Sequence, residues 1–111
     1  MRARQWTFTF CPFDRYPCPD VCPTPCGNEI TLHVGQAYQI LIYNGDAEDV
    51  TETHQLADPW GPGIRGGPLP QGGALPPEIF TPQTPGDFPF NCTNVCGAGH
   101  DNMIGVVHVA P

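Results

Sequence analysis

Proline and glycine constrain this chain more than any other feature of its sequence. They account for 15 and 13 of the 111 residues, and few windows of 12 residues are free of both. Proline inside a helix removes a backbone hydrogen bond and clashes with the preceding turn, and glycine weakens helices. Helical periodicity is nearly absent, so the sequence predicts short strands joined by turns.

Short runs rich in β-branched and aromatic residues recur between these breaks and predict seven strands. The predicted strands are 5–10, 29–34, 37–43, 52–57, 78–82, 87–91 and 104–109. Turn signals occur at 34–36 (VGQ) and at 84–86 (TPG). Seven short strands in one domain of this length are typical of an all-β fold, and we expect a β-sandwich of the Greek-key type.

Two segments interrupt this pattern. Residues 11–28, CPFDRYPCPDVCPTPCGN, contain four cysteines and five prolines, which no regular element accommodates. Residues 58–77, DPWGPGIRGGPLPQGGALPP, form a long Pro/Gly loop. A structureless loop of that length in a compact domain is usually functional or mobile. We therefore expect a single domain over 1–111 with a Cys/Pro-rich insertion at 11–28.

The charge of the chain excludes one class of partner. Its net charge is −7 with only four Lys and Arg residues, so nothing in it could neutralise the phosphates of a nucleic acid.

No stretch approaches the ~20 apolar residues of a membrane span, and residues 1–10 lack the apolar run of a signal peptide. The chain is expected to be soluble as given, although a parent protein could carry a membrane anchor.

An acidic cluster lies in the segment GDAEDVTE. It consists of Asp46, Glu48, Asp49 and Glu52. The simpler interpretation is a solvated loop. The alternative is a docking patch for a basic protein, which would act mainly on the rate of association.

The segment NCTNVCGAGHDNMIGVVHV, residues 91–109, carries the strongest chemical signal. Cys92, Cys96, His100 and Met103 follow one another at steps of four, four and three. Thiolate and thioether together select soft ions, copper above all, and imidazole suits copper and zinc. A blue-copper site needs one Cys, two His and a weak axial Met, and His54 in ETHQL is the best candidate for a second histidine. Because the loop carries two thiolates, both could bridge a pair of metal ions.

Cys-x3-Cys-x3-His-x2-Met, with a histidine 38 residues upstream of the first cysteine, resembles the dinuclear CuA site of cupredoxin domains. Such domains occur in subunit II of haem–copper cytochrome c oxidases and in nitrous oxide reductase. FTPQTPGDFPFNC and CGAGHDNMIGVVHV resemble the approach to the ligand loop, the loop itself and the last strand. The resemblance covers 29–57 and 78–109 well and 5–10 loosely, and it implies a cupredoxin-like Greek-key β-sandwich.

The resemblance also implies a role for each ligand residue. Cys92 and Cys96 would bridge two copper ions, and His54 and His100 would each bind one of them. Met103 would be a weak axial ligand of one copper. The main-chain carbonyl of Asn94 would be the axial ligand of the other, a role that needs no particular side chain. The alternative is a Cys92–Cys96 disulfide, with His100 and Met103 as loop packing.

The implied function is electron transfer through this centre, without catalysis by the domain itself. The donor would be a cytochrome c or a small copper protein, and the acceptor a terminal oxidase subunit. The parent would be membrane-anchored, with this domain in the periplasm or on the outer face of the cytoplasmic membrane. Two alternatives remain: a mononuclear blue-copper carrier, and a cuprous-cluster or copper-storage protein. Nitrous oxide reductase is a possible parent, although this chain has no copper-sulfide domain.

The four early cysteines depart from the family pattern. They are Cys11, Cys18, Cys22 and Cys26. Two disulfides in any of three connectivities would stabilise the insertion by ~2–4 kcal/mol each. A zinc site is a second interpretation, although the x6, x3, x3 spacing differs from the usual paired C-x2-C. A third is that some of these thiolates join the copper in a larger cluster.

The remaining histidines and tryptophans have simpler interpretations. His33 and His108 alternate with apolar neighbours on predicted strands, so both are expected to face outward. Trp60 is expected to pack under the Pro/Gly loop, the alternative being an electron entry point near the copper. Trp6 is expected in the core.

Overall fold

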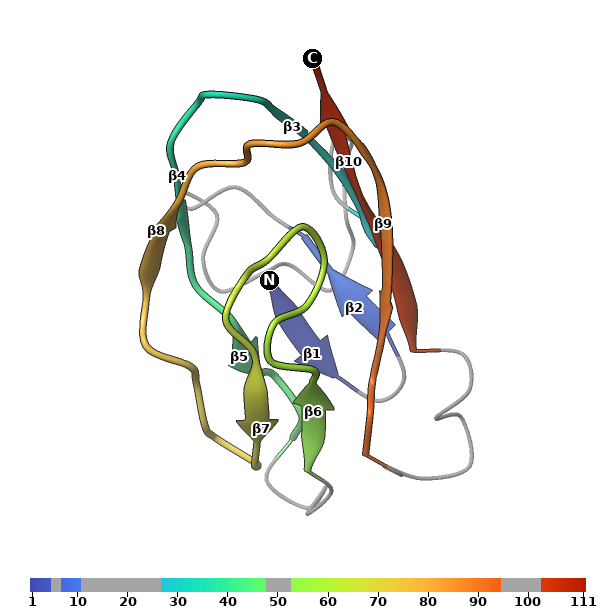
Figure 1. Ribbon diagram of the computed structural model, residues 1–111. Helices are drawn as coiled ribbons and strands as arrows, with labels where there is room; N and C mark the ends of the chain where they lie inside the picture. The colour runs from blue at the N-terminus through green and yellow to red at the C-terminus, as the bar shows by residue number, and fades with distance from the viewer. Residues whose placement is uncertain (5–6, 11–26, 48–52, 95–102) are drawn as a thin grey trace.

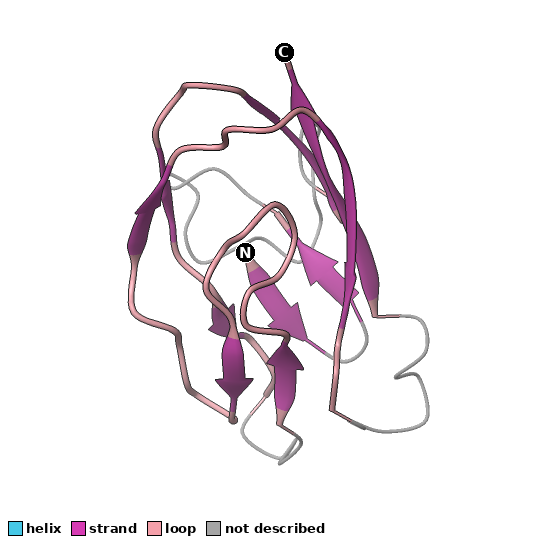
Figure 2. Ribbon diagram, viewed as in Figure 1, coloured by secondary structure: helices cyan, strands magenta, loops and turns pink. Residues whose placement is uncertain are grey.

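The computed structural model describes residues 1–4, 7–10, 27–47, 53–94 and 103–111 of the chain (Figure 1). These residues form strands and loops, with no helix among them (Figure 2). The strands are β1 (Arg2–Arg4), β2 (Thr7–Thr9), β3 (Glu29–His33), β4 (Tyr38–Ile40), β5 (Tyr43–Asn44), β6 (His54–Leu56), β7 (Gly67–Leu69), β8 (Glu78–Phe80), β9 (Gly86–Asn91) and β10 (Ile104–Ala110). The predicted all-β class is confirmed, and the arrangement fits a Greek-key β-sandwich.

The strands pair into four small sheets. Their orders are β2–β1–β5, β3–β10–β9, β4–β8 and β6–β7. In the sheet with the longest strands, β10 runs parallel to β3 and antiparallel to β9, with Val107 opposite Ile30 and Phe88. Figure 1 shows this sheet along one side of the molecule and β4 with β8 along the opposite side. The core fills the space between them.

Strand β10 shows how the sequence pattern produces the core. Gly105, Val107 and Val109 are buried, while the residues between them are partly exposed, as expected for a strand with one face inward. Burying a valine-sized side chain contributes roughly 1.5–3 kcal/mol. The ring of Phe90 lies across this face, and a Cβ atom at position 105 would come within 2.4 Å of it. Glycine is therefore required where β10 passes Phe90.

Five of the predicted strands, at 29–34, 52–57, 78–82, 87–91 and 104–109, are confirmed as β3, β6, β8, β9 and β10. The predicted strand 37–43 is instead divided into β4 and β5, which belong to different sheets. The prediction for 5–10 corresponds to β2, and Trp6 lies outside the described residues. Strand β1 was not predicted because Arg2, Ala3 and Arg4 are neither β-branched nor aromatic.

The expectation of a structureless loop over 58–77 is wrong. Strand β7 lies within it and pairs antiparallel with β6, placing Leu69 opposite His54 and Pro68 opposite Gln55. Proline has no backbone N–H to donate. It is tolerated there because β7 pairs with β6 alone, so no strand on the other side of β7 needs hydrogen bonds from it. Trp60, paired with Ile64 in a turn, is buried with its ring centre 4.7 Å from that of Phe90. Its expected role in packing under this segment is confirmed.

The Cys/Pro-rich insertion begins and ends at one place in the fold. Phe10 and Gly27 form an antiparallel bridge in which each backbone N–H donates to the other residue's carbonyl, at 2.6 and 3.4 Å. The four early cysteines lie outside the described residues, so the three interpretations of their state remain predictions.

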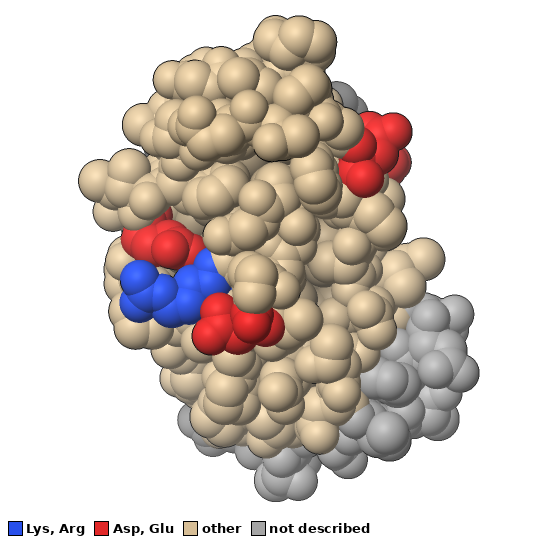
Figure 3. All heavy atoms as spheres, in the orientation of Figure 1, with Lys and Arg blue, Asp and Glu red and all other residues tan. Residues whose placement is uncertain are grey.

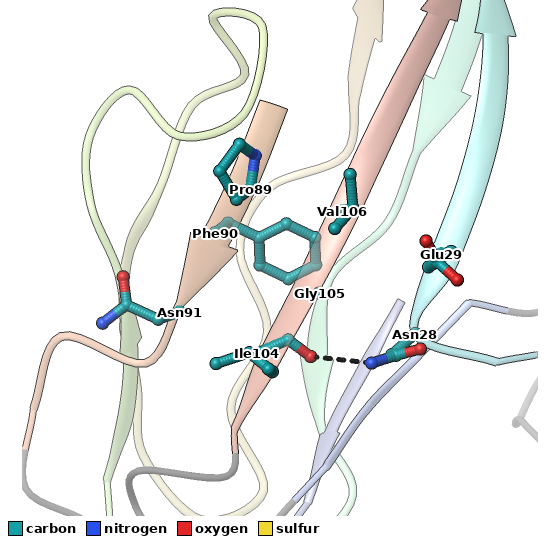
Figure 4. A pocket seen from close by; sticks show the side chains of 8 residues that line it. All are labelled: Asn28, Glu29, Pro89, Phe90, Asn91, Ile104, Gly105 and Val106. Atoms are coloured by element: carbon teal, nitrogen blue, oxygen red, sulfur yellow. Dashed lines mark hydrogen bonds between the residues drawn. The ribbon is translucent and has the colours of Figure 1, made fainter. Parts of the chain in front are cut away.

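A hollow of about 480 Å³ opens beside β3, β9 and β10 (Figure 4). At one end of it the side-chain amide of Asn28 donates to the carbonyl of Ile104 at 3.2 Å. Its lining contains none of the described candidate ligands, so this hollow is separate from the candidate metal centre. In the part of the chain that the structure describes, no helix is long and apolar enough to cross a membrane.

Candidate metal centre

The predicted ligand His54 begins the short strand β6. Its side chain is 0% exposed and, like that of Leu56, faces the interior, while Gln55 between them is partly exposed. This is the ordinary alternation of a strand, with an imidazole in an inward position. Pairing with β7 fixes the backbone at His54, so the ring is held on a regular element rather than on a loop.

The segment after β9 docks against β6 and brings Cys92 to His54. The backbone N–H of Thr93 donates to the carbonyl of Gln55 at 2.8 Å, and the side-chain amide of Asn94 donates to the carbonyl of Thr53 at 2.6 Å. Residues 38 and 41 positions apart in sequence are thus joined on both sides of His54. The resemblance to the CuA pattern requires this proximity.

Cys92 and Met103 are also placed together. Both side chains are fully buried, and the backbone N–H of Cys92 donates to the carbonyl of Met103 at 3.1 Å. The thiol of Cys92 donates to the carbonyl oxygen of Asn94 at 3.2 Å. The carbonyl predicted as an axial ligand therefore points at the sulfur predicted as a bridging ligand.

Four of the six predicted ligand residues are thus described, and their local contacts are consistent with one centre. Cys96 and His100 lie outside the described residues, so their roles remain predictions. Among the described residues, no group of three or more His, Cys, Asp or Glu side chains is arranged to hold a metal ion.

The second partner of His54 is Asp46, which was expected to be part of a solvated acidic loop or docking patch. That expectation is wrong for this residue: its side chain is 2% exposed, and its Oδ2 accepts a hydrogen bond from Nε2 of His54 at 2.6 Å. Glu48, Asp49 and Glu52 lie outside the described residues. No spacing signal in the sequence distinguishes Asp46 from its acidic neighbours.

The electrostatics of His54 reflect both neighbours. Burial lowers the pKa of His54, but the neighbouring side chains of Cys92 and Asp46 raise it, and the net shift is upward. The other ring nitrogen, Nδ1, is buried and has no hydrogen-bond partner among the described residues. Leaving a buried polar atom unsatisfied costs about 1–3 kcal/mol. A metal ion bound at Nδ1 would remove that cost.

The donor types at this place suit copper. An imidazole nitrogen, a cysteine sulfur, a methionine sulfur and a carbonyl oxygen form a mixed soft set, and thiolate with thioether selects copper over the harder metals. The described residues therefore fit the metal that the sequence pattern predicts.

The other two histidines face outward, as expected. His33 is exposed at the end of β3, and His108 on β10 is 37% exposed, between Asp87 and Glu29. Hydrogen bonds to Asp87 and Glu29 raise the pKa of His108.

On the face shown in Figure 3, charged side chains gather in a few small groups and most of the surface is uncharged.

Comparison with known proteins defines the class. The fold is that of a cupredoxin domain, and its solved neighbours include a periplasmic domain of cytochrome oxidase subunit II, a haem–copper terminal oxidase and auracyanin. More particularly, the chain is similar to the periplasmic domain of subunit II of cytochrome oxidase (CoxB) of Bradyrhizobium japonicum. The TM-score is 0.64 at 18% identity, over 98% of this chain and 80% of that one.

A haem–copper terminal oxidase dimer gives a similar result, with a TM-score of 0.63 at 21% identity over 98% of this chain and 60% of that one. Auracyanin from Roseiflexus castenholzii matches with a TM-score of 0.54 at 23% identity, over 76% of this chain and 85% of that one. At these identities the likeness establishes the fold. No protein-family model and no curated protein matches the chain.

Proposed function

We propose that this chain is an electron-transfer domain that holds a dinuclear CuA-type copper centre. The observation that carries the proposal is the meeting of His54 with Cys92, whose sulfur lies beside the Asn94 carbonyl, while Nδ1 of His54 remains without a partner. Cys96 and His100 would complete the bridging and terminal ligands, and Met103 would bind axially. When bound, copper supplies the redox couple, and the chain supplies the fixed environment around it.

The surroundings of the centre suit electron transfer rather than catalysis. His54, Cys92 and Met103 are fully buried, so water is excluded from these three residues. Strands β6 and β10 and the hydrogen bonds around Cys92 hold the ligand backbone in place. A site whose ligands cannot rearrange costs little reorganisation energy when an electron arrives or leaves. The proposed ligand set leaves no coordination position open for a substrate.

We further propose that the parent is a haem–copper oxidase subunit II. The support is the coverage of 98% of this chain by two oxidase domains, one of them periplasmic. On this proposal the domain lies in the periplasm or on the outer face of the cytoplasmic membrane, carried by a membrane-anchored parent. It would accept electrons from a cytochrome c or a small copper protein and pass them to the terminal oxidase subunit.

A mononuclear blue-copper carrier is the second candidate, because auracyanin shares the fold. Copper content with visible and EPR spectra of the partly oxidised protein separates the two. Two coppers per chain, a purple colour and the multi-line EPR pattern of a mixed-valence pair are expected. One copper with a blue colour would favour the mononuclear site, and more than two coppers without visible bands would favour a cuprous cluster that uses the early cysteines.

Cys92→Ser provides the sharpest variant for this test. Removing one bridging sulfur should abolish the mixed-valence spectrum and leave at most one copper bound per chain. A matched control is Thr93→Ser, which changes the neighbouring exposed residue and keeps both cysteines. A Cys92→Ser protein with the wild-type spectrum would contradict the bridging role.

A further inference from the structure

Asp46 is a buried carboxylate that the proposed ligand set does not use. Its side chain is 2% exposed, and burying a carboxylate is costly unless it is paired and hydrogen-bonded. One partner of this carboxylate is Nε2 of His54, at 2.6 Å. The short distance and the burial of both side chains distinguish this pair from an ordinary surface contact.

Asp46 is itself held in place. Its backbone N–H donates to the side-chain oxygen of Asn44 at 2.9 Å, and the side-chain amide of Asn44 donates to the carbonyl of Leu69 at 2.9 Å. Leu69 lies opposite His54 in the β6–β7 pair. The carboxylate and the imidazole are therefore attached to the same short pair of strands, which fixes their relative position.

The hydrogen bond determines which ring nitrogen is available. An ionised carboxylate only accepts hydrogen bonds, so Nε2 of His54 must carry a proton in this pair. In the neutral ring, Nδ1 then has a free lone pair, and Nδ1 is the atom without a partner among the described residues. Metal-bound histidines in proteins generally donate their other N–H in this way, which fixes the ring and strengthens it as a ligand.

We infer that Asp46 is a positioning residue for the metal centre: it locks His54 in the Nε2–H tautomer, so that Nδ1 faces the metal, and its charge lowers the reduction potential. This inference rests on the proposed copper function and adds to it a residue outside the ligand set. The negative charge lies one imidazole ring from the metal, where it favours the more positive, oxidised state.

Two variants and two controls test this role. Asp46→Asn keeps an oxygen that can accept the hydrogen bond but removes the charge, so it should retain copper and raise the reduction potential. Asp46→Leu removes the acceptor, so copper affinity should fall about 10–100-fold, the usual effect of losing such an outer partner. Asp87→Asn and Asp87→Leu make the same changes beside His108, which is remote from the ligands in the fold, and should leave both quantities at wild-type values.

A measurement on the copper-free protein separates positioning from mere folding. In ¹⁵N NMR of the wild-type protein, taken where the ring is neutral, His54 should carry its proton on Nε2, and Asp46→Leu should give a mixture of tautomers. Unchanged potential in Asp46→Asn together with an unchanged tautomer in Asp46→Leu would overturn the inference. A wild-type protein that binds no copper would instead overturn the proposed function.

Discussion

Two histidines of this protein share the same kind of partner and differ in what they can do. Nε2 of His54 and Nδ1 of His108 each lie within 2.7 Å of an aspartate oxygen. His54 is fully buried, and its second nitrogen has no partner among the described residues. His108 lies on the outer side of β10, and its second nitrogen contacts Glu29 at 2.9 Å.

The difference shows what makes a histidine available as a ligand. A ring with both nitrogens engaged by carboxylates has no lone pair to offer, whereas a ring with one nitrogen engaged has its tautomer fixed and the other lone pair available. Burial then decides how costly that free nitrogen is without a metal. The carboxylate is thus a structural partner at His108 and, on our inference, a device for orienting a ligand at His54.

The largest effect that tests this comparison should come from replacing each histidine by glutamine. Glutamine at position 54 can still donate to Asp46, which limits the cost of leaving a buried carboxylate unpaired. His54→Gln should lose copper affinity by more than the ~100-fold associated with outer-shell changes, because it removes a ligand itself. His108→Gln should bind copper as the wild type does. Copper titration followed by the visible spectrum measures both.

Equal copper binding by His54→Gln and the wild type would remove His54 from the ligand set. Equal losses in both variants would mean that the effect follows general destabilisation, which circular dichroism on the copper-free proteins would reveal.

A smaller effect is expected at the axial position. Met103→Leu replaces a weak thioether donor by a hydrocarbon of similar volume, so the protein should keep two coppers. Its reduction potential should rise, because the oxidised centre loses an electron donor. The reverse exchange in the core, Leu32→Met on β3, controls for repacking, since volume-conserving swaps usually cost under about 1.5 kcal/mol.

Voltammetry of Met103→Leu and Leu32→Met measures the reduction potential of each variant and tests whether Met103 is a weak axial ligand. Loss of copper from Met103→Leu would show that the thioether is a principal ligand. A similar shift of potential in Leu32→Met would assign the effect to packing.

The sequence predicts some parts of this molecule well for identifiable reasons. Strand β10 was predictable because its segment, IGVVHVA, is rich in β-branched residues. Cys92 and Met103 could be named as candidate ligands because they lie close together in one segment, whereas the Asn94 carbonyl was implied only by the resemblance to a known site. His54 was the best candidate for a second histidine because of its place on a predicted strand, and its role as a ligand of one copper came from the resemblance to a known site.

Other parts depend on contacts that sequence patterns do not encode. Strand β7 consists of Gly67, Pro68 and Leu69, residues that indicate a loop, and it forms because β6 provides a partner. Asp46 lies among several acidic residues, and its role depends on a turn that directs one carboxylate inward to His54. In both cases tertiary structure overrides the local pattern.

The smallest expected effect is the pH dependence of the stability that His108 contributes. It tests the exposed histidine of the comparison. Hydrogen bonds to Asp87 and Glu29 raise the pKa of His108 in the folded protein above its ordinary value of about 6.5. A group whose folded pKa is raised contributes stability that is fully present below the unfolded pKa and is lost as the pH rises through the folded pKa. The melting temperature of the wild type minus that of His108→Gln should therefore be largest near pH 5 and shrink as the pH rises.

The change should be small because all three side chains are partly exposed and solvent screens them. High salt should reduce it further, as it does for exposed ion pairs. A difference in melting temperature that grows with pH would contradict the ion-paired description of His108. A difference in melting temperature that changes with neither pH nor salt would mean that His108 contributes through packing on β10. The two histidines would then differ in burial, and the ion pairs of His108 would play no part in the comparison.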